Sequence, residues 1–168
     1  MKIVIVGSGR VGAVLAEAYD AEGHEVVILD LSAGAFERLP TEFGGTAIRG
    51  DGTDEDTLRR AGVADADVFL ALTEGDNRNV MAAQVATEKL GIRKVLAKIN
   101  DPVRAAAYAD LGIATLCRTT IQADAINGYL GLAPVGLPSI SAPTGTHHGG
   151  DTHAPLAETL GSVPGQEA

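Results

Sequence analysis

The sequence contains one cysteine, no tryptophan and few aromatic residues, which make up 4% of the chain. The single cysteine, Cys117, excludes an internal disulfide, and a reducing cytoplasm is the compartment that we expect. No apolar run approaches the roughly 18 residues of a membrane-spanning helix, and the N-terminal run is shorter than the core of a signal peptide. We therefore expect a soluble cytoplasmic protein that is able to dock on a membrane partner.

Basic clusters are also missing from this chain. Its 13 Lys and Arg residues are outnumbered by 22 Asp and Glu residues, which gives a formal net charge of −9. Nucleic-acid binding normally needs a basic patch, so the charge pattern disfavours a nucleic-acid partner. No histidine or cysteine arrangement suited to nucleophilic catalysis is present, since His24 is the only histidine before residue 147. We expect no catalytic residues.

Apolar runs alternate with amphipathic segments along residues 1–133. This βα rhythm is typical of a parallel sheet with crossover helices on both faces, and hydrophobic residues, at 45% of the chain, are enough for its core. We predict a Rossmann-like, doubly wound α/β fold with six parallel strands and a C-terminal crossover helix. Strands are expected at about 2–7, 25–30, 46–49, 67–72, 94–99 and 114–117, and helices at about 10–22, 33–43, 54–61, 76–90, 102–111 and 120–131.

Several residues mark the ends of these helices. Thr53 with Asp56 has the spacing of a capping box for the helix at 54–61. Gly91 and Gly112 stand where helices should end, and Pro102 suits a first helical turn.

A glycine-rich turn follows directly on the first predicted strand. Three glycines have the spacing of the dinucleotide-binding fingerprint, in the segment Gly7-Ser8-Gly9-Arg10-Val11-Gly12. The first permits a tight turn, the second lets the backbone approach a pyrophosphate, and the third lets the helix pack close to the strand. The helix that begins near Arg10 points free N–H groups and the positive end of its dipole at that pyrophosphate. We therefore expect an adenine nucleotide at this turn.

An acidic residue, Asp30, closes the second predicted strand. At this distance from the glycines its carboxylate is suited to accept hydrogen bonds from ribose hydroxyls, or to cap the following turn. Its charge opposes a 2′-phosphate, because two like charges about 4 Å apart repel by about 4 kcal/mol at intermediate dielectric. The expected ligands are therefore ADP, ATP or NAD(H) rather than NADP. Arg10 is placed either to hold a terminal phosphate or to lie in solvent on the first helical turn.

Polar residues follow the third and fourth predicted strands and interrupt the fifth. The segment 51–53 is expected to line the adenine, or to form only a turn and a helix cap. Polar residues within 73–79 form first of all a helix N-terminus, and second a set of ribose or phosphate contacts. Lys98 lies in an apolar strand where its charge needs a partner, so it should reach the phosphates or an adjoining carboxylate.

Composition changes sharply after Ala133. Residues 134–168 hold five of the seven prolines, three of the four histidines and no lysine or arginine. This segment lacks the apolar periodicity that would offset its ordering entropy, so we expect a flexible tail after one nucleotide-binding domain at residues 1–133. We expect its histidines, His147, His148 and His153, to bind no metal.

These motifs occur together in a known family. Residues 1 to about 131 resemble the N-terminal lobe of an RCK domain, also called the TrkA-N domain, which regulates potassium channels and Trk and Ktr potassium transporters. The resemblance rests on the glycine turn with Asp30, the segment 50–53, the connection 60–67, Thr73 with Asp76 and Asn79, Lys98, and the step 111–113.

The resemblance implies a cytoplasmic regulatory subunit that binds a nucleotide at the glycine turn and gates a membrane potassium-translocating subunit from the inner face of the cell membrane. It also implies a homodimer or a higher ring, alone or with a second RCK protein. Lys98 matches a basic position that reaches phosphates from a neighbouring subunit. Thr119 and Thr120 stand where many ring-forming members have a Pro-Glu pair that binds a cation, so the resemblance implies no such site here. We expect no C-terminal lobe in this chain.

Two other functions are compatible with the same motifs. A Rossmann sheet also serves NAD-dependent oxidoreductases, although neither a placed acid or base nor a substrate domain supports an enzyme here. A nucleotide-sensing scaffold for another membrane protein differs from the transporter subunit only in its partner. The residues expected to hold the nucleotide are Gly7, Ser8, Gly9, Arg10, Val11, Gly12, Asp30, Leu31, Asp51, Gly52, Thr53, Thr73, Glu74, Asp76, Asn79 and Lys98.

Overall fold

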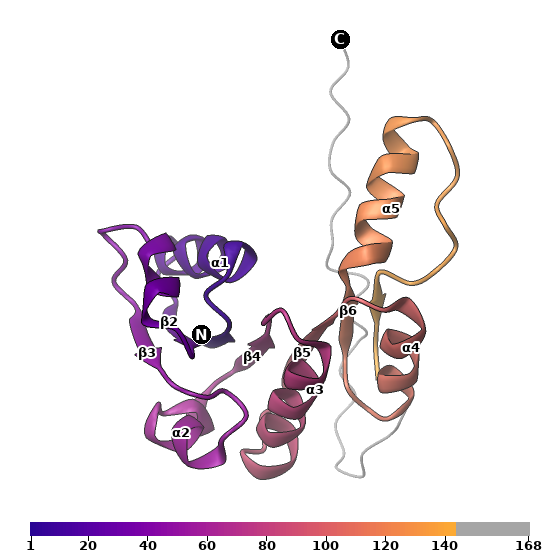
Figure 1. Cartoon of the computed structure of the whole chain (residues 1–168). Helices are drawn as coiled ribbons and strands as arrows, with labels where there is room; N and C mark the ends of the chain where they lie inside the picture. Colours follow the sequence, from indigo (N-terminus) through magenta and orange to yellow (C-terminus); the bar gives the residue numbers. More distant parts are fainter. Residues whose placement is uncertain (144–168) are drawn as a thin grey trace.

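A computed structural model describes residues 1–143 of the chain (Figure 1). Its strands are β1 (Lys2–Val6), β2 (Glu25–Asp30), β3 (Thr46–Arg49), β4 (Val68–Ala71), β5 (Lys94–Ile99), β6 (Thr115–Cys117) and β7 (Ile140–Ser141). Its α-helices are α1 (Arg10–Ala21), α2 (Glu55–Arg60), α3 (Asp76–Gln84), α4 (Pro102–Asp110) and α5 (Arg118–Tyr129). Two 3-10 helices, η1 (Ala33–Arg38) and η2 (Val63–Asp65), and a π-helix, η3 (Val85–Lys89), complete the set.

The predicted Rossmann-like α/β fold is confirmed. Six strands run parallel in the order β3-β2-β1-β4-β5-β6, with β1 near the centre. The chain first winds from β1 toward β3 and then crosses back toward β6, so its crossover helices cover both faces of the sheet. Every predicted bound of these six strands lies within one residue of the observed bound.

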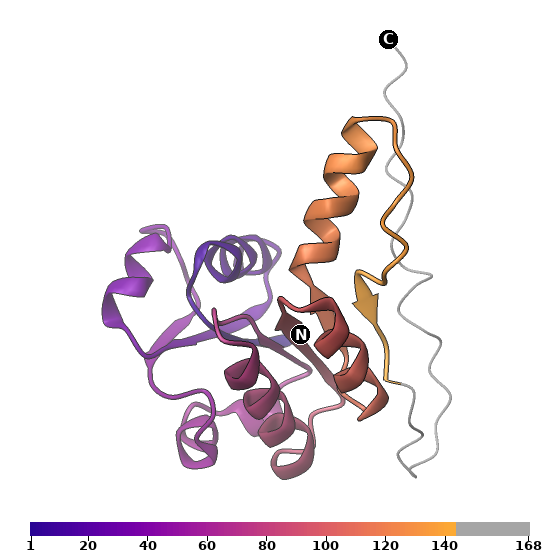
Figure 2. The same ribbon diagram turned by 45° about the vertical axis from the view of Figure 1, so that its right-hand side comes forward.

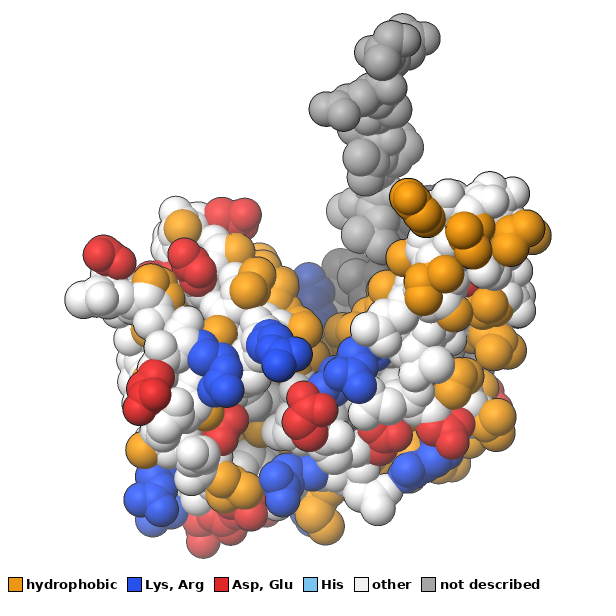
Figure 3. All heavy atoms as spheres, turned by 45° about the horizontal axis from the view of Figure 1, so that its top comes forward, with side chains coloured by type: hydrophobic (Ala, Val, Ile, Leu, Met, Phe, Trp, Pro, Cys, Tyr) orange, Lys and Arg blue, Asp and Glu red, His pale blue; other side chains and the backbone are white. Residues whose placement is uncertain are grey.

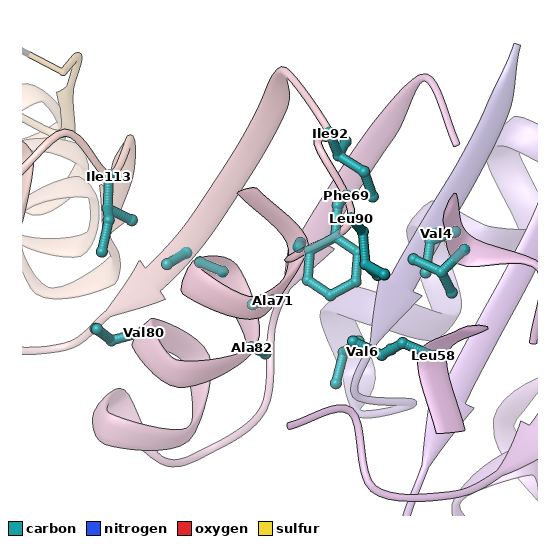
Figure 4. Packing of buried hydrophobic residues seen from close by; sticks show 14 of the residues in the cluster. Val4, Val6, Leu58, Phe69, Ala71, Val80, Ala82, Leu90, Ile92 and Ile113 are labelled. Atoms are coloured by element: carbon teal, nitrogen blue, oxygen red, sulfur yellow. The ribbon is translucent and has the colours of Figure 1, made fainter. Parts of the chain in front are cut away.

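Side chains of β1 alternate between two apolar layers, as the pleat of a strand requires. Ile3 and Ile5 pack with Ala16 of α1 on one face of the sheet. Val4 and Val6 face the other layer, together with Leu58 of α2 and buried alanines of α3 and α4. Figure 4 shows this second layer, in which the Phe69 ring lies between the sheet and its helices. Burial on both faces explains why the strands read as continuous apolar runs.

The second predicted helix, at 33–43, is shorter than expected and is a 3-10 helix. It ends at Arg38, and Leu39 is extended, with φ −75° and ψ 143°. Leu39 precedes Pro40, and a residue before proline is disfavoured in the α-helical region. The helix predicted at 76–90 is also divided, into α3 and the π-helix η3. Gly91, with φ of +71°, follows it where the sequence predicts a helix end.

The N-cap of α2 is Asp54, so the predicted capping box of Thr53 and Asp56 is wrong by one residue. The Asp54 side chain accepts a hydrogen bond of 2.8 Å from the Thr57 N–H. Thr53 instead donates its hydroxyl to Asp51. Two residues able to cap a helix stand side by side here, and the backbone path decides which one acts.

The Asp54 cap predicts a pH dependence of stability. Hydrogen bonds from the Thr57 hydroxyl and N–H lower the pKa of Asp54 below its ordinary value of 3.8. A carboxyl whose pKa is lowered by folding stabilises the fold above its unfolded pKa and loses that contribution as the pH falls through the folded pKa. We expect the free energy of unfolding to fall less below pH 3.8 in Asp54→Asn than in the wild type, because asparagine caps without titrating. Denaturant melts across that range test this, and identical profiles would contradict it.

The sheet has a seventh strand, β7, which lies within the segment predicted to be a flexible tail. β7 pairs antiparallel with β6, and the Cys117 N–H donates to the Ser139 carbonyl at 2.8 Å (Figure 2). The chain returns along α5, where Asp124 accepts a 2.8 Å hydrogen bond from the Val135 N–H. The prediction of a flexible tail is therefore wrong up to residue 143. The predictions for residues 144–168, including the three histidines, lie outside the described residues.

Helix α5 stands away from the sheet and leaves apolar side chains in solvent. Figure 3 shows hydrophobic side chains gathered over α5 and the turn after it. Among them Tyr129 is 91% exposed, and Ile126, Leu130 and Leu132 are each about 60% exposed. Cys117, at the end of β6, is a buried free thiol. Between residues 1 and 143, no helix has the length and hydropathy to span a membrane.

Candidate functional site

The parallel register brings three strand ends level at one edge of the sheet. Val6 of β1 lies opposite Leu29 of β2 and Ala71 of β4. The glycine turn after β1, Asp30 at the end of β2 and the segment after β4 are therefore neighbours, although the sequence separates them widely. Ligands of open α/β sheets bind at this carboxyl edge, where the winding reverses.

A cleft of about 200 Å³ opens at this edge. The residues that line it come from the ends of β1, β2, β3 and β4 and from the first turn of α3. They are Val6, Gly7, Gly9, Asp30, Leu31, Gly50, Asp51, Gly52, Leu72, Thr73, Glu74 and Arg78. Eight of the predicted site residues are thus brought together, namely Gly7, Gly9, Asp30, Leu31, Asp51, Gly52, Thr73 and Glu74.

The three glycines of the fingerprint differ in what makes glycine suitable at each position. Gly7 has φ of +110°, and a Cβ there would lie 2.9 Å from the backbone after β4. A Cβ on Gly12 would lie 1.9 Å from the Gly7 carbonyl oxygen. Gly9 is the N-cap of α1 with an ordinary extended conformation, and a Cβ there would meet nothing within 4 Å. Packing therefore requires Gly7 and Gly12, whereas Gly9 leaves its space to the cleft.

Asp30 is held in the cleft by two backbone groups. Its Oδ2 accepts a hydrogen bond of 2.8 Å from the Ser8 N–H, and its Oδ1 accepts one of 2.9 Å from the Ser32 N–H. A carboxylate offers about four acceptor positions, so these bonds orient the group and leave acceptor capacity for ribose hydroxyls. Asp30 thus fixes the glycine turn and the turn after β2 at once. The two roles weighed for it from the sequence are compatible.

The segment after β3 forms a compact turn at the end of the cleft beside β2. Asp51 Oδ1 accepts hydrogen bonds from the Thr53 N–H at 2.9 Å and from the Thr53 hydroxyl at 2.8 Å. These bonds hold the backbone of Gly50 to Gly52 against the cleft, and Thr53 itself lies outside the lining. Its contact with a nucleotide stays a prediction.

Asn79 lies beneath the cleft, fully buried. Its Oδ1 accepts from the Thr73 N–H and the Thr73 hydroxyl, and its Nδ2 donates to the carbonyls of Thr73 and Lys98, all at 2.7–2.9 Å. The amide oxygen thus accepts two hydrogen bonds and the amide nitrogen donates two, which is the full capacity of the group. Asn79 therefore ties the end of β4 to β5 and supports the Thr73 backbone that lines the cleft.

We expect Asn79→Ala to destabilise the fold by about 3 kcal/mol, because it leaves buried groups of Thr73 and Lys98 without partners. Chemical denaturation measures the loss. Gln84→Ala is the matched control, since Gln84 is exposed on the same helix and should change stability by less than about 0.5 kcal/mol. Equal effects of the two substitutions would contradict the role given to Asn79.

Asp76 and Lys98 also act beside the cleft rather than in its lining. Asp76 Oδ1 accepts from the Asn100 N–H at 3.0 Å, and its Oδ2 lies 3.7 Å from Arg104 Nη1. Lys98 Nζ lies 3.7 Å from Glu74 Oε1, which confirms the predicted pairing with an adjoining carboxylate. The Lys98 side chain is 5% exposed and that of Glu74 is 85% exposed. A phosphate contact of either Asp76 or Lys98 stays a prediction.

The remaining predicted residues surround the glycine turn. Ser8 is buried and donates its hydroxyl to the Ala35 carbonyl at 3.1 Å, so its side chain joins the glycine turn to η1. Arg10 and Val11 are exposed on the first turn of α1. Neither side chain belongs to the cleft lining, and their phosphate contacts stay predictions.

A family model places the chain among known proteins. The model for the TrkA-N domain matches residues 3–119. The chain belongs to the TrkA-N domain family. Its resemblance to this family, noted from the motifs, is therefore confirmed, and the cleft lies within the matched residues of this TrkA-N domain.

Curated relatives carry the same domain in longer proteins. The chain is 47% identical over 124 residues to the Trk system potassium uptake protein TrkA of Streptomyces coelicolor, covering 74% of this chain and 56% of that protein. It is 33% identical over 113 residues to a TrkA homolog of Methanothermobacter thermautotrophicus, covering 67% and 52%. The chain thus spans about half the length of these relatives.

Solved structures share the fold at lower identity. The TrkA-N domain of the inner membrane protein ybaL from Escherichia coli superposes with a TM-score of 0.68 at 20% identity, covering 77% of this chain and 96% of that one. The AMP-bound C-terminal domain of Kef from Shewanella denitrificans gives a TM-score of 0.62 at 23% identity, covering 80% and 84%.

Four lining residues of this TrkA-N domain were not predicted to be in the site, namely Val6, Gly50, Leu72 and Arg78. Val6 and Leu72 are the apolar floor, and their place follows once the ends of β1 and β4 are known to be adjacent. Arg78 lies three residues after Gly75, in the first turn of α3. The signal that could have identified it is its distance from the end of β4, not a motif of its own. Within residues 1–143, no three His, Cys, Asp or Glu side chains are grouped to hold a metal ion.

Proposed function

We propose that this chain is the nucleotide-sensing regulatory subunit of a potassium transporter or channel. It binds ADP, ATP or NAD(H) in the cleft, works at the cytoplasmic face of the membrane and gates a potassium-translocating membrane subunit. The observation that carries the proposal is the carboxylate of Asp30, oriented in the cleft by Ser8 and Ser32 next to the uncapped N-terminus of α1. Ribose hydroxyls and a pyrophosphate are the groups that such a pair recognises.

The comparisons support the same proposal from another direction. Curated relatives are named Trk system potassium uptake proteins, and one domain of the same fold is described in an AMP-bound form. In this proposal the TrkA-N domain carries the nucleotide site, and the rest of those longer proteins is not matched by this chain. Potassium transport is therefore proposed for this chain through its partner.

We propose a homodimer, or a higher ring alone or with a second RCK protein, as the working assembly. Support comes from the apolar side chains of α5, where Ile126, Tyr129 and Leu130 lie in solvent. Contiguous exposed apolar surface on a soluble domain marks an interaction site. A nucleotide that binds two arrangements of such a dimer with different affinity shifts their balance, and a typical coupling of about 1–3 kcal/mol changes the gate by about 5–150-fold.

A flux assay tests the regulatory function. The membrane subunit is reconstituted in vesicles with and without this chain, and potassium uptake is measured with ADP, ATP or NADH. We expect uptake to depend on the chain and to respond to nucleotide, and Gly9→Ala to remove the response to nucleotide while the chain still binds the vesicles. Uptake that is unchanged by removal of the chain would contradict the proposal.

A further inference from the structure

Arg78 is the only cation among the described residues that line the cleft. The other charged lining residues are Asp30, Asp51 and Glu74, all acidic. An acidic cleft repels phosphates except where a positive group faces them. The α1 N-terminus supplies one such place, at the glycine turn, and Arg78 supplies a second.

The order of the strands places the α1 N-terminus and Arg78 at different points along an extended nucleotide. Asp30 ends β2, the glycine turn follows β1, and Thr73, Glu74 and Arg78 follow β4, in the spatial order β2-β1-β4. A nucleotide whose ribose lies at Asp30 and whose first phosphates lie at the glycine turn therefore points its far end at Arg78. Figure 1 shows the N-terminal end of α3 beyond β4 on this path.

The surroundings of Arg78 leave its charge uncompensated. Glu74, the acid nearest to it in sequence within the lining, pairs with Lys98 at 3.7 Å. Asp76, in the same helical turn, accepts hydrogen bonds from Asn100 and lies 3.7 Å from Arg104 Nη1. No ion pair of Arg78 occurs within residues 1–143. The helix dipole also disfavours a cation in a first turn, so an anion at this point would stabilise Arg78.

The N-terminus of α3 is itself open. Its N-cap, Gly75, makes no side-chain capping bond, as is also true of Gly9 at α1. By contrast, α2 and α4 begin on Asp54 and Asp101, whose carboxylates accept first-turn N–H groups. The two helices that contribute to the cleft thus lack an N-cap carboxylate that would occupy the first-turn N–H groups in place of a phosphate.

We propose that Arg78 is the specificity residue for the terminal phosphate of a nucleoside di- or triphosphate. This inference rests on the proposed nucleotide site and assigns its selectivity to α3. The sequence favours Arg10 for this task, but Arg10 lies outside the lining, whereas the Arg78 guanidinium is free to make the charge-assisted bidentate contacts that phosphate prefers.

Calorimetry with AMP, ADP and ATP on the full chain tests the assignment. We expect Arg78→Gln to weaken ATP binding about 10-fold or more and AMP binding less than about 2-fold, and to flatten the salt dependence of ATP binding. Arg93→Gln, the same change at the opposite edge of the sheet, is the control and should leave the ATP-to-AMP ratio unchanged. Circular dichroism verifies that both variants fold.

Each other outcome overturns the assignment. An equal loss for AMP and ATP, or an unchanged ATP-to-AMP ratio, would show that Arg78 does not contact the terminal phosphate while the nucleotide site itself stands. An equal effect of Arg93→Gln would show a general effect of charge. A wild-type chain that binds none of the three nucleotides would overturn the nucleotide site as well.

Discussion

Alanine at position 9 is expected to weaken nucleotide binding strongly in a chain that stays folded, whereas alanine at position 12 is expected to destabilise the fold. A Cβ on Gly9 meets no protein atom within 4 Å, so Gly9→Ala should change the free energy of unfolding by less than about 1 kcal/mol. The same Cβ would enter the space that we propose for the pyrophosphate. We expect ADP to bind about 30-fold more weakly, which corresponds to about 2 kcal/mol.

The contrast with Gly12 makes this experiment decisive. A Cβ on Gly12 would lie 1.9 Å from the Gly7 carbonyl oxygen, and the backbone would have to move. We expect Gly12→Ala to lose about 3 kcal/mol of stability, since overpacking typically costs about 1–3 kcal/mol and a clash with backbone falls at the upper end of that range. Thermal melts and calorimetry are measured on both variants. A Gly9→Ala chain that binds ADP as the wild type does would contradict a pyrophosphate at the glycine turn.

Removal of the Asp30 charge is expected to lower nucleotide affinity by a similarly large factor. Asp30→Asn keeps one oxygen for Ser8 or Ser32 and loses the charged acceptor for ribose. Because a hydrogen bond to a charged group contributes about 1.5–3 kcal/mol, we expect ADP affinity to fall by about 2 kcal/mol. Discrimination against a 2′-phosphorylated nucleotide should weaken in the same variant, because the like charge has gone.

A double-mutant cycle separates ribose contact from structural damage. Asp30→Asn also disturbs the bonds from Ser8 and Ser32, so a loss of ADP affinity alone is ambiguous. The cycle compares ADP with 2′-deoxy-ADP on the wild type and on Asp30→Asn. We expect the wild type to prefer ADP and the variant to bind both about equally, a coupling of about 1–2 kcal/mol. Equal preference for ADP in both proteins would mean that Asp30 does not contact the ribose.

Much of the cleft could be predicted because its residues directly follow strands that are evident from the sequence. Continuous apolar runs located β1, β2 and β4 within a residue, and the parallel fold brings residues after such strands to one edge. Asp30 and the glycine turn are therefore found from spacing alone. The role of Gly9 in particular follows from the fingerprint, since neither its conformation nor its neighbours require glycine.

Other features depend on tertiary contacts that a local pattern does not contain. β7 has two residues and exists because β6 offers an open edge and Asp124 holds the returning chain. From the sequence, Asn79 is expected at a helix N-terminus or in contact with the ligand. In the fold, β5 lies beside β4, so Asn79 is buried and its amide donates to the carbonyls of Thr73 and Lys98. Arg78 lines the cleft because the first turn of α3 follows closely on the end of β4, so its distance from β4 was the available signal although no motif marks it. β7 and the buried amide of Asn79 depend on how elements meet, and no spacing rule describes that.

The crystal structure of the full chain with ADP tests the central claim most directly. The account predicts the adenosine ribose within hydrogen-bonding distance of the Asp30 carboxylate and the diphosphate against the backbone N–H groups that begin α1. The claim is contradicted if ADP lies outside the cleft, or lies in it with the ribose turned away from Asp30.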